Sequence, residues 1–158
     1  MMIYKEEKGE EKRVKIEDIE YGQPIVYGGI KPTKDPTDDT TYTFAGWNPA
    51  LKSGDTVTGN QTYIATYTSS ARLYLVTFDS DGGSEVEAQH VRYNYNAVEP
   101  KDPTKIDKFG TYKFLGWHYV KEDGTLGEQA TFPIEITKAI VLKAKWEMEK
   151  RAEVIFRH

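Results

Sequence analysis

Hydrophobic and polar residues alternate along much of the chain with the two-residue period of β-strands. From Arg72 to Phe78, β-branched and aromatic residues dominate, and this run stops at the glycine-rich segment 79–83. Such a run followed by Asp-Gly-Gly predicts a strand that enters a hairpin. Residues 86–93 alternate again, with a change of phase near Gln89 that predicts a bulge in the return strand.

The N-terminal residues show the same pattern in a more charged form. Ile3 and Tyr4 precede a turn at Gly9, and the apolar residues from Val14 to Tyr21 predict the return strand. No sustained apolar stripe with the period of a helix occurs, so at most a helical turn is expected. Prolines block regular ladders and predict extended connections in the middle of each half of the chain. They are Pro24, Pro32, Pro36, Pro100 and Pro103.

Two blocks of sequence occur twice in the same order. The block 42–47, Tyr-Thr-Phe-Ala-Gly-Trp, returns at 112–117 as Tyr-Lys-Phe-Leu-Gly-Trp, and the block 62–67, Thr-Tyr-Ile-Ala-Thr-Tyr, is followed at 141–146 by Val-Leu-Lys-Ala-Lys-Trp. A period of roughly 70 to 80 residues is long enough for each copy to enclose its own small core. The sequence therefore predicts a mainly β protein, α+β at most, with two tandem domains of about four strands each. The predicted domains are residues 1–70 and 71–148, followed by a tail, 149–158, in which Val154–Phe156 could begin a truncated third copy.

The repeated block places aromatic side chains where a small sheet needs them. Alternation puts Tyr42 and Phe44 on one face of a strand, while Gly46 lets the backbone bend so that Trp47 turns toward the core. The same argument holds for the second block, and an aromatic residue near the end of each copy completes the set. The predicted structural core consists of Tyr42, Phe44, Gly46, Trp47, Tyr67, Tyr112, Phe114, Gly116, Trp117 and Trp146.

Composition and charge exclude several classes of function. A net charge of −4 argues against a nucleic-acid partner, which requires a basic face. No apolar run approaches the roughly 20 residues that span a bilayer, so membrane insertion is not expected. The absence of cysteine excludes disulfides and thiolate sites, and it suits a cytoplasmic protein as well as an exported bacterial one.

The residues that could carry chemistry point away from catalysis. His90, His118 and His158 have no partner at metal-ligand or triad spacing, so we expect them at the surface without a role. Asp79–Glu85 could hold calcium, but it lacks EF-hand spacing and fits ordinary hairpin chemistry. Two small cores leave little room for a catalytic cleft, and no phosphate loop or nucleophile elbow is present. The sequence predicts no enzyme and no cofactor.

The order of the blocks resembles a known family. Tyr21-Gly22, Asp35-Pro36-Thr37, the aromatic block, Val57-Thr58-Gly59-Asn60 and a closing Ala-x-Tyr or Ala-x-Trp are similar to the Listeria–Bacteroides repeat, the B-repeat type of internalin B. The likeness covers nearly all of residues 1–148 as two copies. The second copy departs from the pattern with Asn94 in place of glycine, with Thr137-Lys138 in place of Thr-Gly, and with a longer loop over 118–133.

The resemblance implies a small β-grasp-like, ubiquitin-like fold, repeated within large secreted or cell-surface bacterial proteins. It also implies a role as spacer, adhesion module or assembly module. Exposed tyrosines at Tyr27, Tyr95 and Tyr119 could bind a host-surface protein or a glycan, or they could instead pack within their own copies. Val154–Phe156, as an unpaired apolar strand, is predicted to add to a sheet edge or to form a chain–chain contact.

Overall fold

The computed structural model describes residues 2–5, 11–15, 17–151 and 153–158, with side chains for 17–149 and 153–158. Throughout these ranges the chain forms strands, turns and irregular segments, and no helix. The protein is therefore all-β. It divides into two compact units, Met1–Arg72 and Leu73–His158, close to the predicted boundary between residues 70 and 71.

The first unit contains a four-stranded sheet with the order β2-β1-β4-β3. The first strand pairs antiparallel with the second, parallel with the last, and the last pairs antiparallel with β3. The predicted N-terminal hairpin is thus present, although its Gly9 turn lies outside the described residues. Its return strand ends at Lys15, so the predicted extension to Tyr21 is wrong. The strands are β1 (Met2–Lys5), β2 (Glu11–Lys15), β3 (Thr40–Asn48) and β4 (Tyr63–Ala71).

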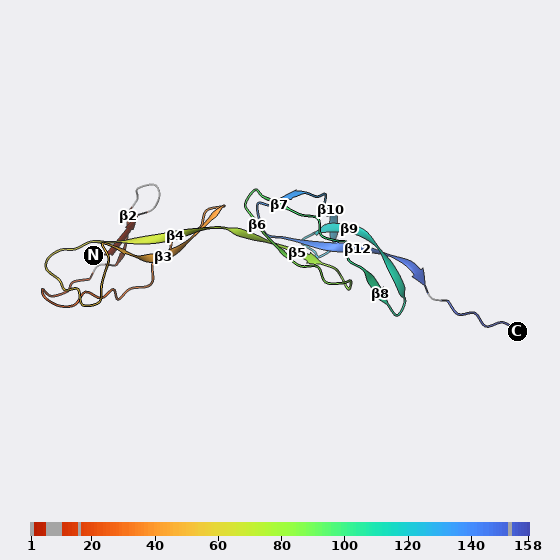
Figure 1. Ribbon diagram of the computed structural model, residues 1–158, viewed down its shortest axis with the longest axis horizontal. Coiled ribbons are helices and arrows are strands. Elements are labelled where there is room, and N and C mark those ends of the chain that lie inside the picture. The colour runs from red at the N-terminus through yellow and green to blue at the C-terminus, as the bar shows by residue number, and fades with distance from the viewer. Residues whose placement is uncertain (1, 6–10, 16, 152) are drawn as a thin grey trace. The chain divides into compact units, whose positions relative to one another are not determined.

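The second unit contains a six-stranded sheet with the order β10-β9-β12-β5-β6, and β8 pairs with β9 beside this path. A separate two-stranded sheet, β11-β7, completes the unit, and Figure 1 shows β12 running beside β5. The strands are β5 (Leu73–Asp79), β6 (Gln89–Arg92), β7 (Asn96–Ala97), β8 (Lys105–Asp107), β9 (Gly110–Val120), β10 (Leu126–Gln129), β11 (Ile134–Glu135) and β12 (Ile140–Arg151).

The two units share one topology. The order β6-β5-β12-β9 of the second unit repeats β2-β1-β4-β3 of the first, with the same parallel pairing of first and last strands. The turns after the return strands also match, since the backbone N–H of Gly22 donates to Val57 and that of Asn94 donates to Ile136, both at 2.8 Å. Gly22 and Asn94 have positive φ angles of 84° and 64°, a conformation that glycine and asparagine tolerate best. Asn94 is therefore a conservative departure from the repeat pattern.

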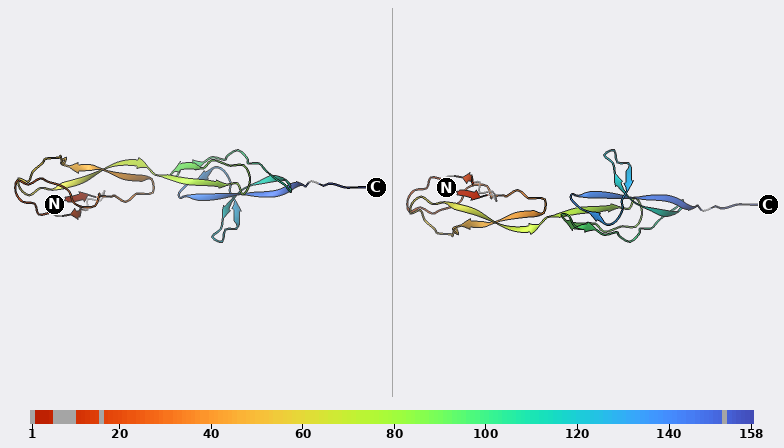
Figure 2. Two further views of the ribbon diagram at one scale, coloured as in Figure 1. Left: turned by 90° about the horizontal axis from the view of Figure 1, so that it is seen from below. Right: turned by 90° about the horizontal axis from the view of Figure 1, so that it is seen from above.

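The number of strands differs between the units. The prediction of about four per copy agrees with the first unit, whereas the second has additional short strands within the described residues. One of them arises because the longer loop over 118–133 folds back on β9, where Leu126 pairs with Val120 and Gln129 with His118. This hairpin projects from the second unit in the views of Figure 2.

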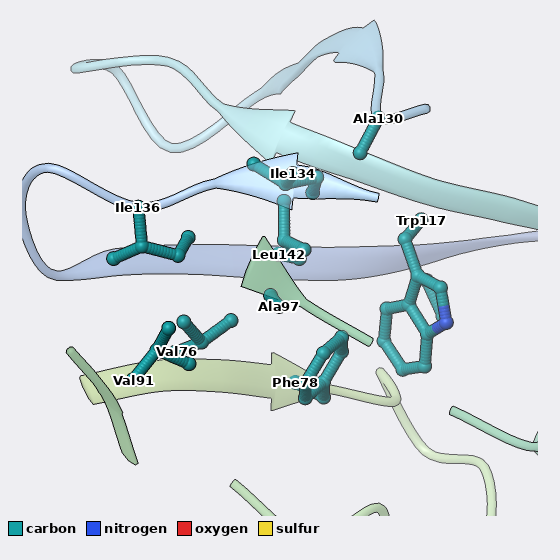
Figure 3. Packing of buried hydrophobic residues seen from close by; sticks show 10 residues of the cluster. Val76, Phe78, Val91, Ala97, Trp117, Ala130, Ile134, Ile136 and Leu142 are labelled. Carbon is teal, nitrogen blue, oxygen red and sulfur yellow. The ribbon is translucent and has the colours of Figure 1, made fainter. Parts of the chain in front are cut away.

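The hydrophobic core of the second unit lies between its main sheet and the β7–β11 pair. Figure 3 shows side chains from β5, β11 and β12 converging around Ala97 on β7. Alternation along the two parallel strands accounts for this, because every second residue of β5 and β12 faces the same side. The buried cluster comprises Val76, Phe78, Val91, Ala97, Trp117, Ala130, Ile134, Ile136, Leu142 and Ala144.

The described part of the first unit has a smaller core. Ile25 and Tyr63 are buried together, and partly buried side chains pack around them. In place of the β7–β11 pair, the first unit has an isolated bridge between Pro24 and Thr56. Less apolar surface is therefore removed from water by the described residues of this unit. The surrounding side chains are Tyr27, Trp47, Leu51 and Val57.

The C-terminal segment does not pair with either unit. Residues 153–158 form no strand, and Val154 and Phe156 are 76% and 93% exposed. The expected addition of Val154–Phe156 to a sheet edge of the same chain is therefore wrong. The topology of the described strands agrees with this: in each unit the first strand is held by the last strand of the same unit, and the described residues include no further strand of that kind for Val154–Phe156 to pair with.

Candidate functional site

The repeated aromatic block forms the same β-bulge in both units. In the first unit Phe44 pairs with Tyr67 and Gly46 with the adjacent Thr66, so Ala45 is the extra residue. In the second unit Phe114 pairs with Trp146 and Gly116 with Lys145, which leaves Leu115 as the extra residue. The two glycines adopt φ angles of 115° and 120°, which L side chains rarely adopt. The bulge explains why glycine precedes the tryptophan in each block.

The bulge sets the tryptophan edge-on to the preceding phenylalanine. Ring centroids are 5.3 Å apart in both Phe44–Trp47 and Phe114–Trp117, with interplanar angles of 68° and 66°. Trp117 is only 2% exposed and also meets Phe78 at 5.0 Å, in the position seen in Figure 3. Its counterpart Trp47 is half-buried. Of the residues predicted to form the structural core, Trp117 is buried. The others are only partly buried: Tyr42, Phe44, Gly46, Trp47, Tyr67, Tyr112, Phe114, Gly116 and Trp146.

Trp146 joins the end of the last strand to the turn that follows β5. Its indole N–H donates a 2.8 Å hydrogen bond to the carbonyl of Ser80, and its ring lies 5.4 Å from that of Phe114. The ring also lies against Gly83, where an added Cβ would come within 2.6 Å of it. The matching Tyr67 donates from its hydroxyl to the carbonyl of Thr33 at 3.3 Å. Both residues thus use the polar tip of an aromatic side chain to hold a distant segment.

Tyr112 and Tyr42 each lie under a lysine. The ammonium group of Lys105 is 4.7 Å from the Tyr112 ring centre, and that of Lys34 is 4.3 Å from the Tyr42 ring centre. Tyr112 also donates a 2.9 Å hydrogen bond from its hydroxyl to the carboxylate of Asp107, across the β8–β9 hairpin. This bond raises the pKa of Tyr112. The pKa of Asp107 is lowered, because its carboxylate accepts a hydrogen bond from the backbone N–H of Phe109 and a second one from the Tyr112 hydroxyl.

Replacing Asp107 with asparagine should lower the pKa of Tyr112 toward the ordinary value of about 10, because no carboxylate then opposes the phenolate. In the unmodified protein the raised pKa means that this bond stabilises the fold below about pH 10 and is lost as the pH rises through the folded-state pKa. A carbon NMR titration of the Tyr112 ring measures the shift. Asp123→Asn is the control, because the Asp123 carboxylate accepts hydrogen bonds from Thr125. If the pKa of Tyr112 were unchanged in the Asp107 variant, Asp107 would not be the cause of its raised value.

The three tyrosines predicted to bind a partner have different environments. Tyr27 is half-buried, with its ring 4.9 Å from Trp47, and Tyr119 packs partly buried against the core of the second unit. Only Tyr95 of these three is largely exposed, at 61%, and Arg92 lies 5.9 Å from its ring centre. Tyr27 and Tyr119 therefore pack within their own units, which is the alternative that the sequence left open, and Tyr95 has the exposure expected of a partner-binding residue.

The histidines and acidic residues that the structure describes do not gather into one group. His90 and His158 are exposed, but the surface position expected for His118 is wrong: it is buried on β9, and its Nδ1 lies 3.0 Å from the Gly127 carbonyl oxygen of β10. In the Asp79–Glu85 turn, the Asp79 carboxylate accepts from the backbone of Asp81. No group of three or more potential metal-binding side chains converges in the described part of the chain.

An exposed apolar hollow near Tyr95 was not predicted. It has a volume of about 480 Å³ and is bordered by Leu73 at the start of β5, by β6 and by residues of the segment 95–98. Leu73 and Val98 are 52% and 69% exposed, although both are aliphatic. The side chain of Gln89 fixes one border, because its amide donates to the Val98 carbonyl and accepts from the Val98 N–H. Sequence spacing gave no signal for this hollow, since its residues come together only through the turn at 93–95.

The matched sheets and bulges define an all-β repeat domain. Residues 74–145 match the family described as the Listeria-Bacteroides repeat domain, so the chain contains one such domain, in its second unit. The two copies predicted from sequence are thus supported by a family match for the second only. This copy was the one with the greater departures from the expected pattern.

Two longer bacterial proteins are similar to this chain. Both come from Evansella cellulosilytica: "Putative membrane protein", 29% identical over 123 residues, and "Putative Gly-rich membrane protein", 30% identical over 118 residues. The alignments cover 73% and 69% of this chain but only 17% and 13% of those proteins. No solved structure matches the chain. Among the residues that the structure describes, we find no helix able to cross a membrane.

Proposed function

We propose that the chain is a non-catalytic structural module of a longer secreted or cell-surface bacterial protein, in which it acts as a spacer. The observation that carries this proposal is the repetition of one sheet topology and one aromatic bulge in two consecutive units. Repetition of a unit that encloses its own core lengthens a chain by one folded domain with each addition. The small share of the similar proteins that this chain covers supports a modular role within a longer protein.

On this proposal, residues 1–72 are a diverged copy of the same repeat, and both copies are β-grasp-like domains in which extended segments, rather than a helix, cover the sheet. The matched turns at Gly22 and Asn94 support the common origin. The alignments with the similar proteins support it too. Residues 73–158 make up little more than half of the chain, so both alignments include part of the first unit. Val154–Phe156 would then be the first strand of a third copy, paired once the last strand of that copy is present, or in contact with a neighbouring chain.

The connection between the copies is short, as a spacer requires. Only Arg72 separates the end of β4 from the start of β5. Its backbone N–H donates to the Asp39 carbonyl and its guanidinium donates to the Thr37 carbonyl, both at 2.9 Å. These bonds tie the connecting residue to the first unit and leave little free chain at the junction.

Surface display tests the spacer function. One, two or three copies of residues 1–148 are inserted between a membrane anchor and an epitope on a bacterial surface, with glycine–serine linkers of equal length as controls. We expect antibody staining of the epitope to rise with each copy and to exceed that of the matched linker, because folded domains keep their dimensions whereas flexible chains collapse toward a coil. Staining no better than that of the linkers would overturn the proposal.

Adhesion is the second candidate, and the hollow beside Tyr95 favours it. Exposed aromatic and aliphatic side chains gathered around one depression are typical of protein or glycan recognition. Labelled protein is titrated onto host cells and glycan arrays, with Tyr95→Ser as the test variant and Tyr21→Ser, an even more exposed site in the other unit, as the control. Saturable binding lost only in the Tyr95 variant would establish adhesion, and its absence leaves the spacer role.

A further inference from the structure

We infer that each unit is built to resist stretching, through the parallel pair formed by its first and last strands. For its biological use this inference rests on the proposed spacer function, since a spacer in an extracellular protein transmits force along the chain. The force-resisting element in the second unit is the β5–β12 pair, which we name the terminal clamp. It consists of Ile140, Val141, Leu142 and Lys143 paired with Val76, Thr77, Phe78 and Asp79.

The direction of the two strands decides how tension acts on the clamp. The chain enters the unit at the start of β5 and leaves it at the end of β12, and the strands are adjacent and parallel. A pull on both ends therefore draws the strands past each other along their length, so that the paired residues bear the force together. A pull on the same end of both strands would instead open the pairs one after another.

The rest of the second unit supports the clamp. On its other side, β12 is paired with β9 over nine residue pairs, against four with β5, so sliding should begin between β5 and β12. One face of the clamp is shielded from water, because Val76, Phe78 and Leu142 are buried in the core. At the far end of β5, the indole of Trp146 is bonded to Ser80, and Lys143 lies 3.8 Å from the Asp81 carboxylate.

The first unit has the same arrangement in a shorter form. Its β1 and β4 are parallel neighbours with three paired positions, beginning at Met2 with Tyr63. The buried cluster found among its described residues is also smaller. We therefore expect the first unit to yield at lower force than the second when the whole chain is stretched.

The absence of cysteine makes a direct test possible, because introduced cysteines can carry the handles for single-molecule force measurements. The full chain with Leu73→Cys and Glu149→Cys is pulled along the clamp. The full chain with Leu73→Cys and Lys138→Cys is pulled across it, since residue 138 lies just before β12 at the same end as the start of β5. All three positions are exposed. At equal loading rate, the first variant should unfold at a force at least about twofold higher, because forced unfolding follows the unfolding barrier along the pulled direction.

A matched substitution and a stability control make the outcome decisive. Denaturant midpoints of both double-cysteine variants should agree, which shows that only direction differs. Trp146→Phe, added to each, should lower the force measured along the clamp and leave the force across it nearly unchanged, because the Ser80 bond lies at the end that opens last in the second geometry. Equal forces in the two directions would overturn the clamp. Equal forces would not affect the surface-display test of the spacer function. Conversely, a failed display test together with the expected force difference would overturn the spacer function and leave the clamp standing.

Discussion

Replacement of Trp117 by alanine should strongly destabilise the second unit and leave the stability of the first unit unchanged. Its indole is almost completely buried against Phe78 and Phe114, and truncating a buried tryptophan costs about 3–5 kcal/mol. A domain of this size has only about 4–13 kcal/mol of total stability. Calorimetry should therefore resolve two transitions in the parent protein and a large downward shift of only one of them in the variant.

Trp47→Ala is the matched control in the other unit. Because Trp47 is half-buried and packs against Tyr27 and Phe44, its removal should cost less, about 1–3 kcal/mol, and should move the other transition. Proton NMR of the remaining tryptophan indoles would assign each transition to its unit. A single transition moved equally by both substitutions would show one cooperative structure and would contradict two separately folding units.

Gly83→Ala should destabilise the second unit by about 1–3 kcal/mol through overpacking. The added Cβ would come within 2.6 Å of the Trp146 ring and within 3.1 Å of the carbonyl oxygens of Ser80 and Thr104. None of these groups can move freely, because the Trp146 indole is bonded to the Ser80 carbonyl and the Thr104 carbonyl accepts from Ser84. Denaturant unfolding, followed through the signal of the second unit, measures the loss.

A double-substitution cycle separates crowding by the indole from other effects. In a Trp146→Leu background, the smaller side chain leaves room for the Cβ, so Gly83→Ala should cost less than in the parent protein. Part of the cost should remain, since the two backbone oxygens are unchanged. Strictly additive losses would show that the indole does not set the requirement for glycine at this position.

The strand pattern and the aromatic block could be predicted because their signals are local. A glycine between two aromatic residues of an alternating run indicates a bend, and both Gly46 and Gly116 lie at bulges. The extent of burial was not accessible in the same way. Trp47 and Trp117 have nearly identical neighbours in sequence, yet they differ in exposure, and Trp117 meets Phe78 of β5 within the larger buried cluster of the second unit.

Long-range contacts explain the remaining differences. Tyr27 lies in a proline-rich connection that looked exposed, but it is covered by Trp47, a residue about twenty positions later. His118 looked like an isolated surface histidine, and the hairpin formed by β10 buries it. The hollow beside Tyr95 depends on a turn that brings Val98 back to Gln89. Each of these features arises from a segment whose position is set by tertiary packing rather than by its own pattern.

The position of β12 in the sheet also has a consequence for how the protein is made. The strand β5 leaves the ribosome first, but its parallel partner begins at Ile140 and is synthesised only after residues 80–139. Until then the nascent chain can form the β5–β6 hairpin but cannot close its central sheet, and such distant pairing slows folding. The sheet of the second unit thus stays incomplete until its last strand has been translated.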